Sequence, residues 1–141
     1  MAQDPALIDR VLDSPWLWPL ARLALCSAYL LGGVVKLSNF PAAAVEQAHF
    51  GLEPGWLWAA AAITIELGGS ILVITDRLVW LGAGALGVLT AIATLVADPF
   101  WSVEGPGRAM AANGFFEHLG LIAGLVLVTL FAHRRSTGIR L

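Results

Sequence analysis

Four long apolar stretches alternate with short polar segments along the chain. They cover approximately residues 16–35, 56–74, 78–97 and 113–132. Each reaches the ~20 apolar residues that a helix needs to cross a ~30 Å hydrocarbon layer. Only helices and closed barrels satisfy every backbone group inside a bilayer. The pattern therefore predicts an all-α integral membrane protein whose single membrane domain covers residues 1–141.

Two of the predicted spans are preceded by residues that typically occur at the start of a helix. Ser14-Pro15 precedes the first span and Pro54-Gly55 precedes the second. Only residues 75–77 separate the second and third spans, so these two helices must be antiparallel neighbours. Tryptophans, which favour the membrane–water interface, fall near the predicted ends at Trp16, Trp18, Trp56, Trp58, Trp80 and Trp101.

Two shorter helices are also expected outside the spans. Residues 41–50 have proline in the first turn and are followed by Gly51, which predicts a short helix in the first outer connection. Residues 6–14 place four apolar side chains on one face. This segment can form a helix on the inner membrane surface, with a frayed tail as the alternative.

Polar and small residues within each span are spaced by three or four, so that they share one helical face. These faces consist of Arg22, Cys26, Tyr29, Gly33 and Lys36 in the first span, Ala59, Ala62, Glu66, Gly69 and Val73 in the second, Gly87, Thr90, Thr94 and Asp98 in the third, and Gly114, Glu117, Gly120 or Leu121, and Gly124 in the fourth. Small residues let backbones approach, and polar residues find partners across the interface. The pattern predicts an antiparallel four-helix bundle with a polar seam.

Glu66 is the deepest ionisable residue of this predicted seam, about 15 Å below the start of its helix. A carboxylate at that depth must be protonated or paired, and an intramembrane acid is a candidate functional residue. Glu117 and His118 lie nearer the outer end of their span, where they form either a proton relay or a hydrogen-bonded interface pair. We therefore predict Glu66, Glu117 and His118 as residues for proton transfer or ligand hydrogen bonding.

Four further polar residues of the seam, Arg22, Tyr29, Lys36 and Asp98, are candidate substrate-binding residues. Lys36 and Asp98 would flank the outer mouth, whereas Arg22 approaches from the inner side. Structural alternatives remain for three of them. Arg22 can extend its guanidinium to the headgroups, Lys36 can anchor its helix at the interface, and Tyr29 can bond a backbone carbonyl.

The composition agrees with a membrane location and excludes several other classes of protein. Hydrophobic residues make up 58% of the chain and charged residues 13%, against roughly 45–50% and 25% in soluble domains. The net charge of -2, with only 8 scattered Lys and Arg residues, argues against nucleic-acid binding. Cys26 is the single cysteine, so the chain alone cannot form a dithiol or a thiolate metal site. Glu46 and His49 have the spacing of carboxylate-bundle metal ligands, but the motif occurs once and outside the spans, so we predict no metal site.

Basic residues are distributed unequally between the two sides of the predicted spans. One side carries Lys36 and Arg108, and the other carries Arg10, Arg22, Arg77, Arg134, Arg135 and Arg140. Because positive charge resists translocation, this asymmetry predicts that both termini are cytoplasmic.

Several short motifs occur in a set order along nearly the whole chain. They are Arg22 near the start of the first span, Gly33-Val34-Val35-Lys36 at its end, Glu66-Leu67-Gly68-Gly69 in the second, Pro99-Phe100-Trp101 after the third, and Asn113-Gly114-Phe115-Phe116 leading into Leu119-Gly120-Leu121-Ile122. On these motifs the chain resembles the DoxX family, small four-span bacterial membrane proteins related to the DoxD subunit of thiosulfate:quinone oxidoreductase and to the MauE group. The resemblance implies a multi-pass protein of the bacterial cytoplasmic (inner) membrane.

The chain departs from the family pattern at two positions of the outer mouth. Asp98 or Pro99 stands where many relatives have histidine, and Glu117 stands where they have lysine. The mouth is therefore more acidic than in those relatives. An anionic sulfur substrate such as thiosulfate would be repelled by these carboxylates.

The functional hypothesis is an accessory or quinone-contacting subunit of a membrane redox complex. No intrinsic cofactor motif is visible, so the chain would supply a pocket and protons to a quinone rather than carry electrons, and would at most be one subunit of a quinone-linked oxidoreductase. Its expected partners are the lipid bilayer and either another membrane or peripheral redox protein or a second copy. The alternatives are a small proton-coupled transporter and a non-catalytic scaffold or assembly subunit.

Overall fold

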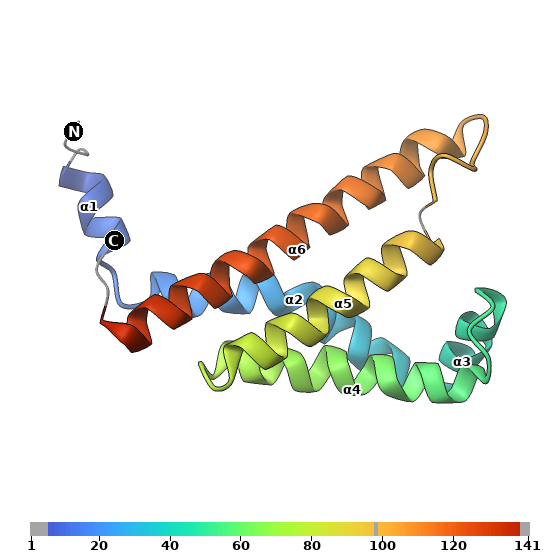
Figure 1. Cartoon of the computed structure of the whole chain (residues 1–141), viewed down its shortest axis with the longest axis horizontal. Helices are drawn as coiled ribbons and strands as arrows, with labels where there is room; N and C mark the ends of the chain where they lie inside the picture. Colours follow the sequence, from blue (N-terminus) through green and yellow to red (C-terminus); the bar gives the residue numbers. More distant parts are fainter. Residues whose placement is uncertain (1–5, 98, 139–141) are drawn as a thin grey trace.

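A computed structural model describes residues 6–97 and 99–138 of the chain, so the candidate residue Asp98 lies outside the described residues. The described residues form six helices and no strand. The helices, drawn in Figure 1, are α1 (Ala6–Leu12), α2 (Leu17–Ser38), α3 (Phe40–His49), α4 (Gly55–Ile74), α5 (Val79–Ala97) and α6 (Gly107–Thr137).

Four of these helices, α2, α4, α5 and α6, are long and apolar enough to cross a membrane. The prediction of an all-α protein with four candidate spans is therefore confirmed. The helix bounds agree with the predicted ones to within three residues for α2, α4 and α5.

Helix α6 differs most from its prediction, because it begins at Gly107 rather than at residue 113 and extends to Thr137. The extra turns at its start are formed by residues 108–112, whose Arg, Ala and Met side chains favour a helix without adding to the apolar run. The helix ends at Gly138, which has a left-handed backbone with φ of 69°.

The short helix α3 lies against the start of α4 (Figure 1). Its first turn is capped by Asn39, whose side chain accepts a hydrogen bond from the Ala42 backbone N–H at 3.3 Å. Gly55 permits the close approach of the two helices, because a Cβ at this position would collide with the Ala44 carbonyl oxygen. The predicted short outer helix is thus confirmed, and α1 also forms, with its side chains exposed.

The long helices pack mainly in chain order, α2 on α4, α4 on α5 and α5 on α6. Helices α2 and α6 contact each other less extensively, with Trp18 and Phe131 ring centroids 5.8 Å apart and Leu25 lying over Gly124. Helix α1 and the last turns of α6 lie at the same end of the molecule (Figure 1). We call this the α1 end, and the end that carries α3 the α3 end.

Candidate functional site

Helices α2 and α4 share an interface, and both bury residues that the spacing places on their inner faces, although Tyr29 and Gly69 contact α5. On α2 these are Arg22, Cys26, Tyr29 and Gly33, and on α4 they are Ala59, Ala62, Glu66, Gly69 and Val73. The predicted rotation of both helices is confirmed. The centre of the protein consequently carries several polar side chains, and each must find a partner without water.

Glu66 is paired with Lys36 across this interface. The ammonium Nζ lies 2.8 Å from Oε1 and 3.1 Å from Oε2 of the carboxylate. Both side chains are largely shielded, with 21% of Lys36 and 12% of Glu66 exposed. Gly32 leaves the space for this contact, since a Cβ there would stand 3.3 Å from both Lys36 Nζ and Glu66 Oε1. Lys36 therefore reaches into the interface between helices instead of only anchoring α2 at the membrane surface.

A cavity of about 240 Å³ lies beside this ion pair, between α3, α4 and α5. Lys36 lines it together with two polar residues of α3, Glu46 and Gln47. The rest of the lining is mostly apolar and includes Phe50, Trp58, Ile65, Leu89 and Ile92. The wall of the cavity is thus mostly apolar, with a cationic group at one edge. No sequence pattern predicts this cavity, because it requires α3 to dock against α4.

A second polar network joins α2, α5 and α6. The Tyr29 hydroxyl lies 2.7 Å from the Thr90 hydroxyl, which donates to the Leu86 carbonyl. Thr94 donates to the Thr90 carbonyl at 2.6 Å and lies 2.9 Å from His118 Nδ1. With the Thr94 hydroxyl hydrogen directed at the Thr90 carbonyl, the contact with His118 is a hydrogen bond in the tautomer that carries hydrogen on Nδ1. Tyr29 therefore bonds a threonine side chain rather than a backbone carbonyl.

Glu117 does not join either network, contrary to the prediction of a common seam. Its carboxylate is exposed and accepts a hydrogen bond from Asn113 Nδ2, one turn earlier in the same helix, at 2.6 Å. The residues of α6 that face the neighbouring helices are instead His118, Leu121, Leu125 and Val128. Leu121 and Gly124 of the predicted face do contact neighbouring helices, whereas Glu117 does not and its neighbour His118 does.

Glycines are weak indicators of the buried face of α6, because a glycine permits close packing but does not require it. Gly120 has no atom within 4 Å of the position that a Cβ would take, so it faces away from the other helices. Gly124, in contrast, lies under Leu25.

Arg22 forms a separate site near the α1 end. Its Nη1 lies 3.0 Å from Asp76 Oδ1 and donates to the Val73 carbonyl at 3.2 Å. Its guanidinium carbon lies 5.4 Å from the centre of the Trp18 ring. Only 8% of the Arg22 side chain is exposed, so extension into the headgroup region, the alternative from the sequence, is wrong. Asp76 is not among the predicted site residues, although its place in the short turn before α5 puts it at the same membrane depth as the start of α2.

Within the part of the chain that the structure describes, no group of three or more His, Cys, Asp or Glu residues is arranged to hold a metal ion. Glu46, which shares a metal-like spacing with His49, lines the cavity beside Lys36 instead.

The apolar helices with paired charges between them define a multi-pass membrane protein. A family model described as DoxX matches residues 17–99, which includes α2 through α5 and more than half of the chain. The chain belongs to the DoxX family. Comparison with curated proteins and with solved structures gives no match.

Proposed function

We propose that this protein is an accessory subunit of a membrane redox complex and that it holds a quinone headgroup in the cavity between α3, α4 and α5. The helices would form a four-helix bundle in a bacterial cytoplasmic membrane, with both termini in the cytoplasm. DoxX membership, the four apolar helices and the distribution of basic residues support this placement.

The residues around the cavity suit a flat ring that carries carbonyl oxygens. The apolar walls would accept the ring, and a carbonyl needs a hydrogen-bond donor at the edge. Lys36 has three ammonium hydrogens, and its two contacts with the Glu66 oxygens use at most two of them, so that at least one remains for a ligand. The Gln47 amide can supply a second donor from α3.

The Lys36–Glu66 pair carries the proposed chemistry. A bound quinone would supply two-electron, two-proton redox chemistry, with the electrons coming from a partner redox protein. In that setting Lys36 would donate a hydrogen bond to the ligand oxygen and supply one of the two protons, and the second would come from water. Glu66 holds the ammonium in place and offsets its charge.

The other predicted site residues have positioning roles in this proposal. Arg22 joins α2 to the turn between α4 and α5 at the α1 end. Tyr29 joins α2 to α5, and His118 joins α6 to α5. The site roles predicted for Glu117 and Asp98 stay predictions. The single observation that carries the proposal is that Lys36 both lines the cavity and pairs with Glu66.

Quinone binding can be measured directly on the purified protein in lipid nanodiscs. Titration with decylubiquinone should quench tryptophan fluorescence, because Trp58 lines the cavity. Lys36→Gln removes a charged donor and should weaken binding about ten- to hundredfold, corresponding to ~1.5–3 kcal/mol. Ala61→Leu, which narrows the cavity without touching the ion pair, should weaken binding as well.

Arg108→Gln serves as the matched control, since it removes a positive charge from an exposed position at the start of α6. It should leave quinone binding unchanged. If Lys36→Gln and Ala61→Leu, both shown by circular dichroism to be folded, bind decylubiquinone as tightly as the unaltered protein, the proposal fails.

A scaffold or assembly subunit is the second candidate function, because the buried charges bond one another across the helices. Pairing of this kind is sufficient to hold a purely structural bundle together. The double variant Lys36→Met with Glu66→Leu separates the two functions. A scaffold would still copurify with its partners in mild detergent, and the redox activity of the complex would be retained. A quinone-contacting subunit would copurify but lose that activity, while loss of solute uptake alone would indicate a transporter.

A further inference from the structure

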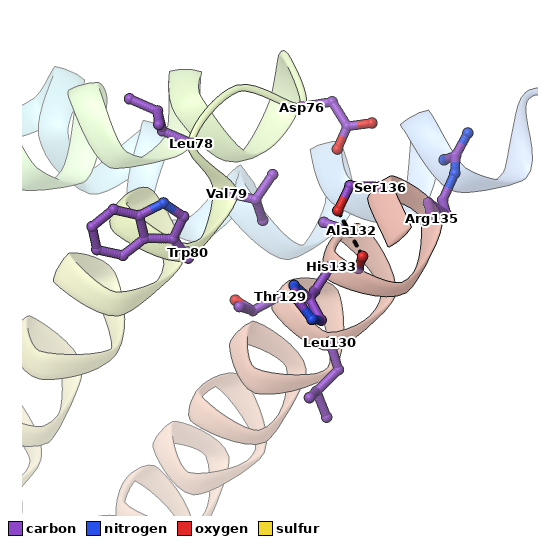
Figure 2. Close-up of a pocket in the computed structure, with 10 residues that line it drawn as sticks. All are labelled: Asp76, Leu78, Val79, Trp80, Thr129, Leu130, Ala132, His133, Arg135 and Ser136. Atoms are coloured by element: carbon purple, nitrogen blue, oxygen red, sulfur yellow. Dashed lines mark hydrogen bonds between the residues drawn. The ribbon is translucent and has the colours of Figure 1, made fainter. Parts of the chain in front are cut away.

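A larger hollow of about 730 Å³ lies at the α1 end, far along the bundle from the Lys36 cavity. It is bounded by the turn between α4 and α5, the first turn of α5 and the last turns of α6 (Figure 2). Its polar lining comes from Asp76, Thr129, His133, Arg135 and Ser136.

This hollow continues into an apolar groove of about 420 Å³ between α5 and α6. Trp80, Thr129 and Leu130 line both spaces, so the two form one groove with a polar mouth. The apolar part follows α5 from Trp80 to Ala91, which is about 16 Å along the helix axis. Its floor contains small residues of α5, and its other wall consists of aliphatic side chains of α6.

The charge at the mouth favours an anion. Within residues 6–97 and 99–138, Arg135 has no carboxylate at salt-bridge distance, and its guanidinium carbon lies 5.7 Å from the Trp18 ring centre. His133 lies beside Thr129 and Leu130 on the same helix (Figure 2). Asp76 is the one acidic residue in the lining, and its charge is offset by Arg22 at 3.0 Å.

We propose that this groove binds an anionic phospholipid. The phosphate would lie against Arg135 and His133, and one acyl chain would follow the apolar groove between α5 and α6. A basic pocket between membrane helices is suited to anionic headgroups, and an indole such as that of Trp80 suits the boundary between headgroup and chain. The apolar continuation selects a lipid over a free phosphate, because a soluble anion would use only the mouth. This site is independent of the proposed quinone cavity.

Native mass spectrometry of the delipidated protein in detergent, with added phosphatidylglycerol or phosphatidylcholine, tests the headgroup contact. The unaltered protein should retain phosphatidylglycerol about fivefold more strongly than phosphatidylcholine. Arg135→Gln should abolish that preference. Arg134→Gln makes the same change of charge on the neighbouring residue, which is exposed and does not line the hollow, and should preserve it. If both variants behave alike, the assignment of the headgroup to this mouth is overturned.

A second pair of variants tests the acyl-chain groove. Gly84 lines the groove and has no atom within 4 Å of an added Cβ, so Gly84→Leu fills the groove without forcing the helices apart. It should reduce phosphatidylglycerol retention several-fold, whereas Gly120→Leu, at an equally open position outside the groove, should not. Two results would overturn the proposal. One is full displacement of phosphatidylglycerol by glycerol 3-phosphate, which indicates a soluble-anion site. The other is loss of a dimer in Gly84→Leu with lipid retention unchanged, which indicates a face for a second copy.

Discussion

The two ion pairs of α2 differ in how many groups hold each cation. Lys36, toward the α3 end, is compensated by both oxygens of Glu66, and both side chains are largely shielded. Arg22, toward the α1 end, has Asp76, the Val73 carbonyl and the Trp18 ring around it. Asp76 is 39% exposed, so water can also solvate this carboxylate.

The difference shows that similar charges in one helix can serve different purposes. A guanidinium with several partners remains held when one of them is lost. An ammonium with one counter-ion depends on it, because an isolated charge in a shielded place is costly. At the α3 end the cation itself, Lys36, lines a cavity. At the α1 end the carboxylate, Asp76, lines a hollow, and Arg22 holds the turn between α4 and α5 against α2. A ligand in the α3-end cavity can therefore contact the cation of its ion pair directly.

The largest effect is expected from Glu66→Ala, which leaves the Lys36 ammonium without its counter-charge. The free energy of unfolding should fall by about 3–5 kcal/mol. Unfolding by increasing SDS in mixed micelles, followed by tryptophan fluorescence, measures this change. The double variant Lys36→Met with Glu66→Leu should recover most of the loss, since an apolar pair needs no compensation. A loss below about 1 kcal/mol in the single variant would show that Lys36 moves to the interface when unpaired.

Asp76→Asn should have a smaller effect, about 1–2 kcal/mol in the same unfolding assay. The amide oxygen can still accept from Arg22, and the Val73 carbonyl and Trp18 ring remain in place. Asp13→Asn, at an exposed position near the same end, removes an equal charge and should be nearly neutral. If Asp76→Asn were as damaging as Glu66→Ala, the proposed redundancy around Arg22 would be refuted.

Tyr29 lies on α2 between the two ion pairs. Tyr29→Phe removes its hydroxyl contact with Thr90. One neutral hydrogen bond corresponds to about 1 kcal/mol of unfolding free energy. Combined with Glu66→Ala, its effect should add to within about 0.5 kcal/mol, because Tyr29 bonds Thr90 whereas Glu66 bonds Lys36. A larger deviation from additivity would mean that the networks act as one unit.

Glu117→Gln should have the smallest effect, within about 0.5 kcal/mol, because the side chain is exposed and bonds only Asn113 on its own helix. His118→Leu, at the neighbouring position, is the comparison, since it removes the contact with Thr94. Thermal unfolding in detergent should show a lower midpoint for His118→Leu than for Glu117→Gln. The reverse order would restore the original prediction that Glu117 faces the other helices.

Helical faces could be predicted on α2 and α4 but only in part on α6. On α2 and α4 the polar and small residues recur every three or four positions, which allows only one buried face. On α6 the informative residues Glu117 and His118 are adjacent, so they point about 100° apart and spacing cannot choose between them. Apolar side chains do not identify the buried face either, because they cover the whole circumference of a membrane helix.

The partners of the charged residues could not be predicted, because they depend on the axial offset between helices. That offset is a property of packing, as at Gly33, where an added Cβ would stand 2.7 Å from the Leu67 side chain. The cavity beside Lys36 likewise exists because α3 docks on α4 at Gly55.

The number, position and approximate length of the spans follow from the order of the amino acids, because the bilayer sets a length of apolar chain that each helix must supply. The same holds for the faces of α2 and α4, where helical periodicity leaves one solution. The pairing of Glu66 with Lys36 and of Arg22 with Asp76, the exclusion of Glu117 and the cavity under α3 follow from packing. Contacts between helices depend on rotation and offset in three dimensions, and no local pattern along a single helix contains that information.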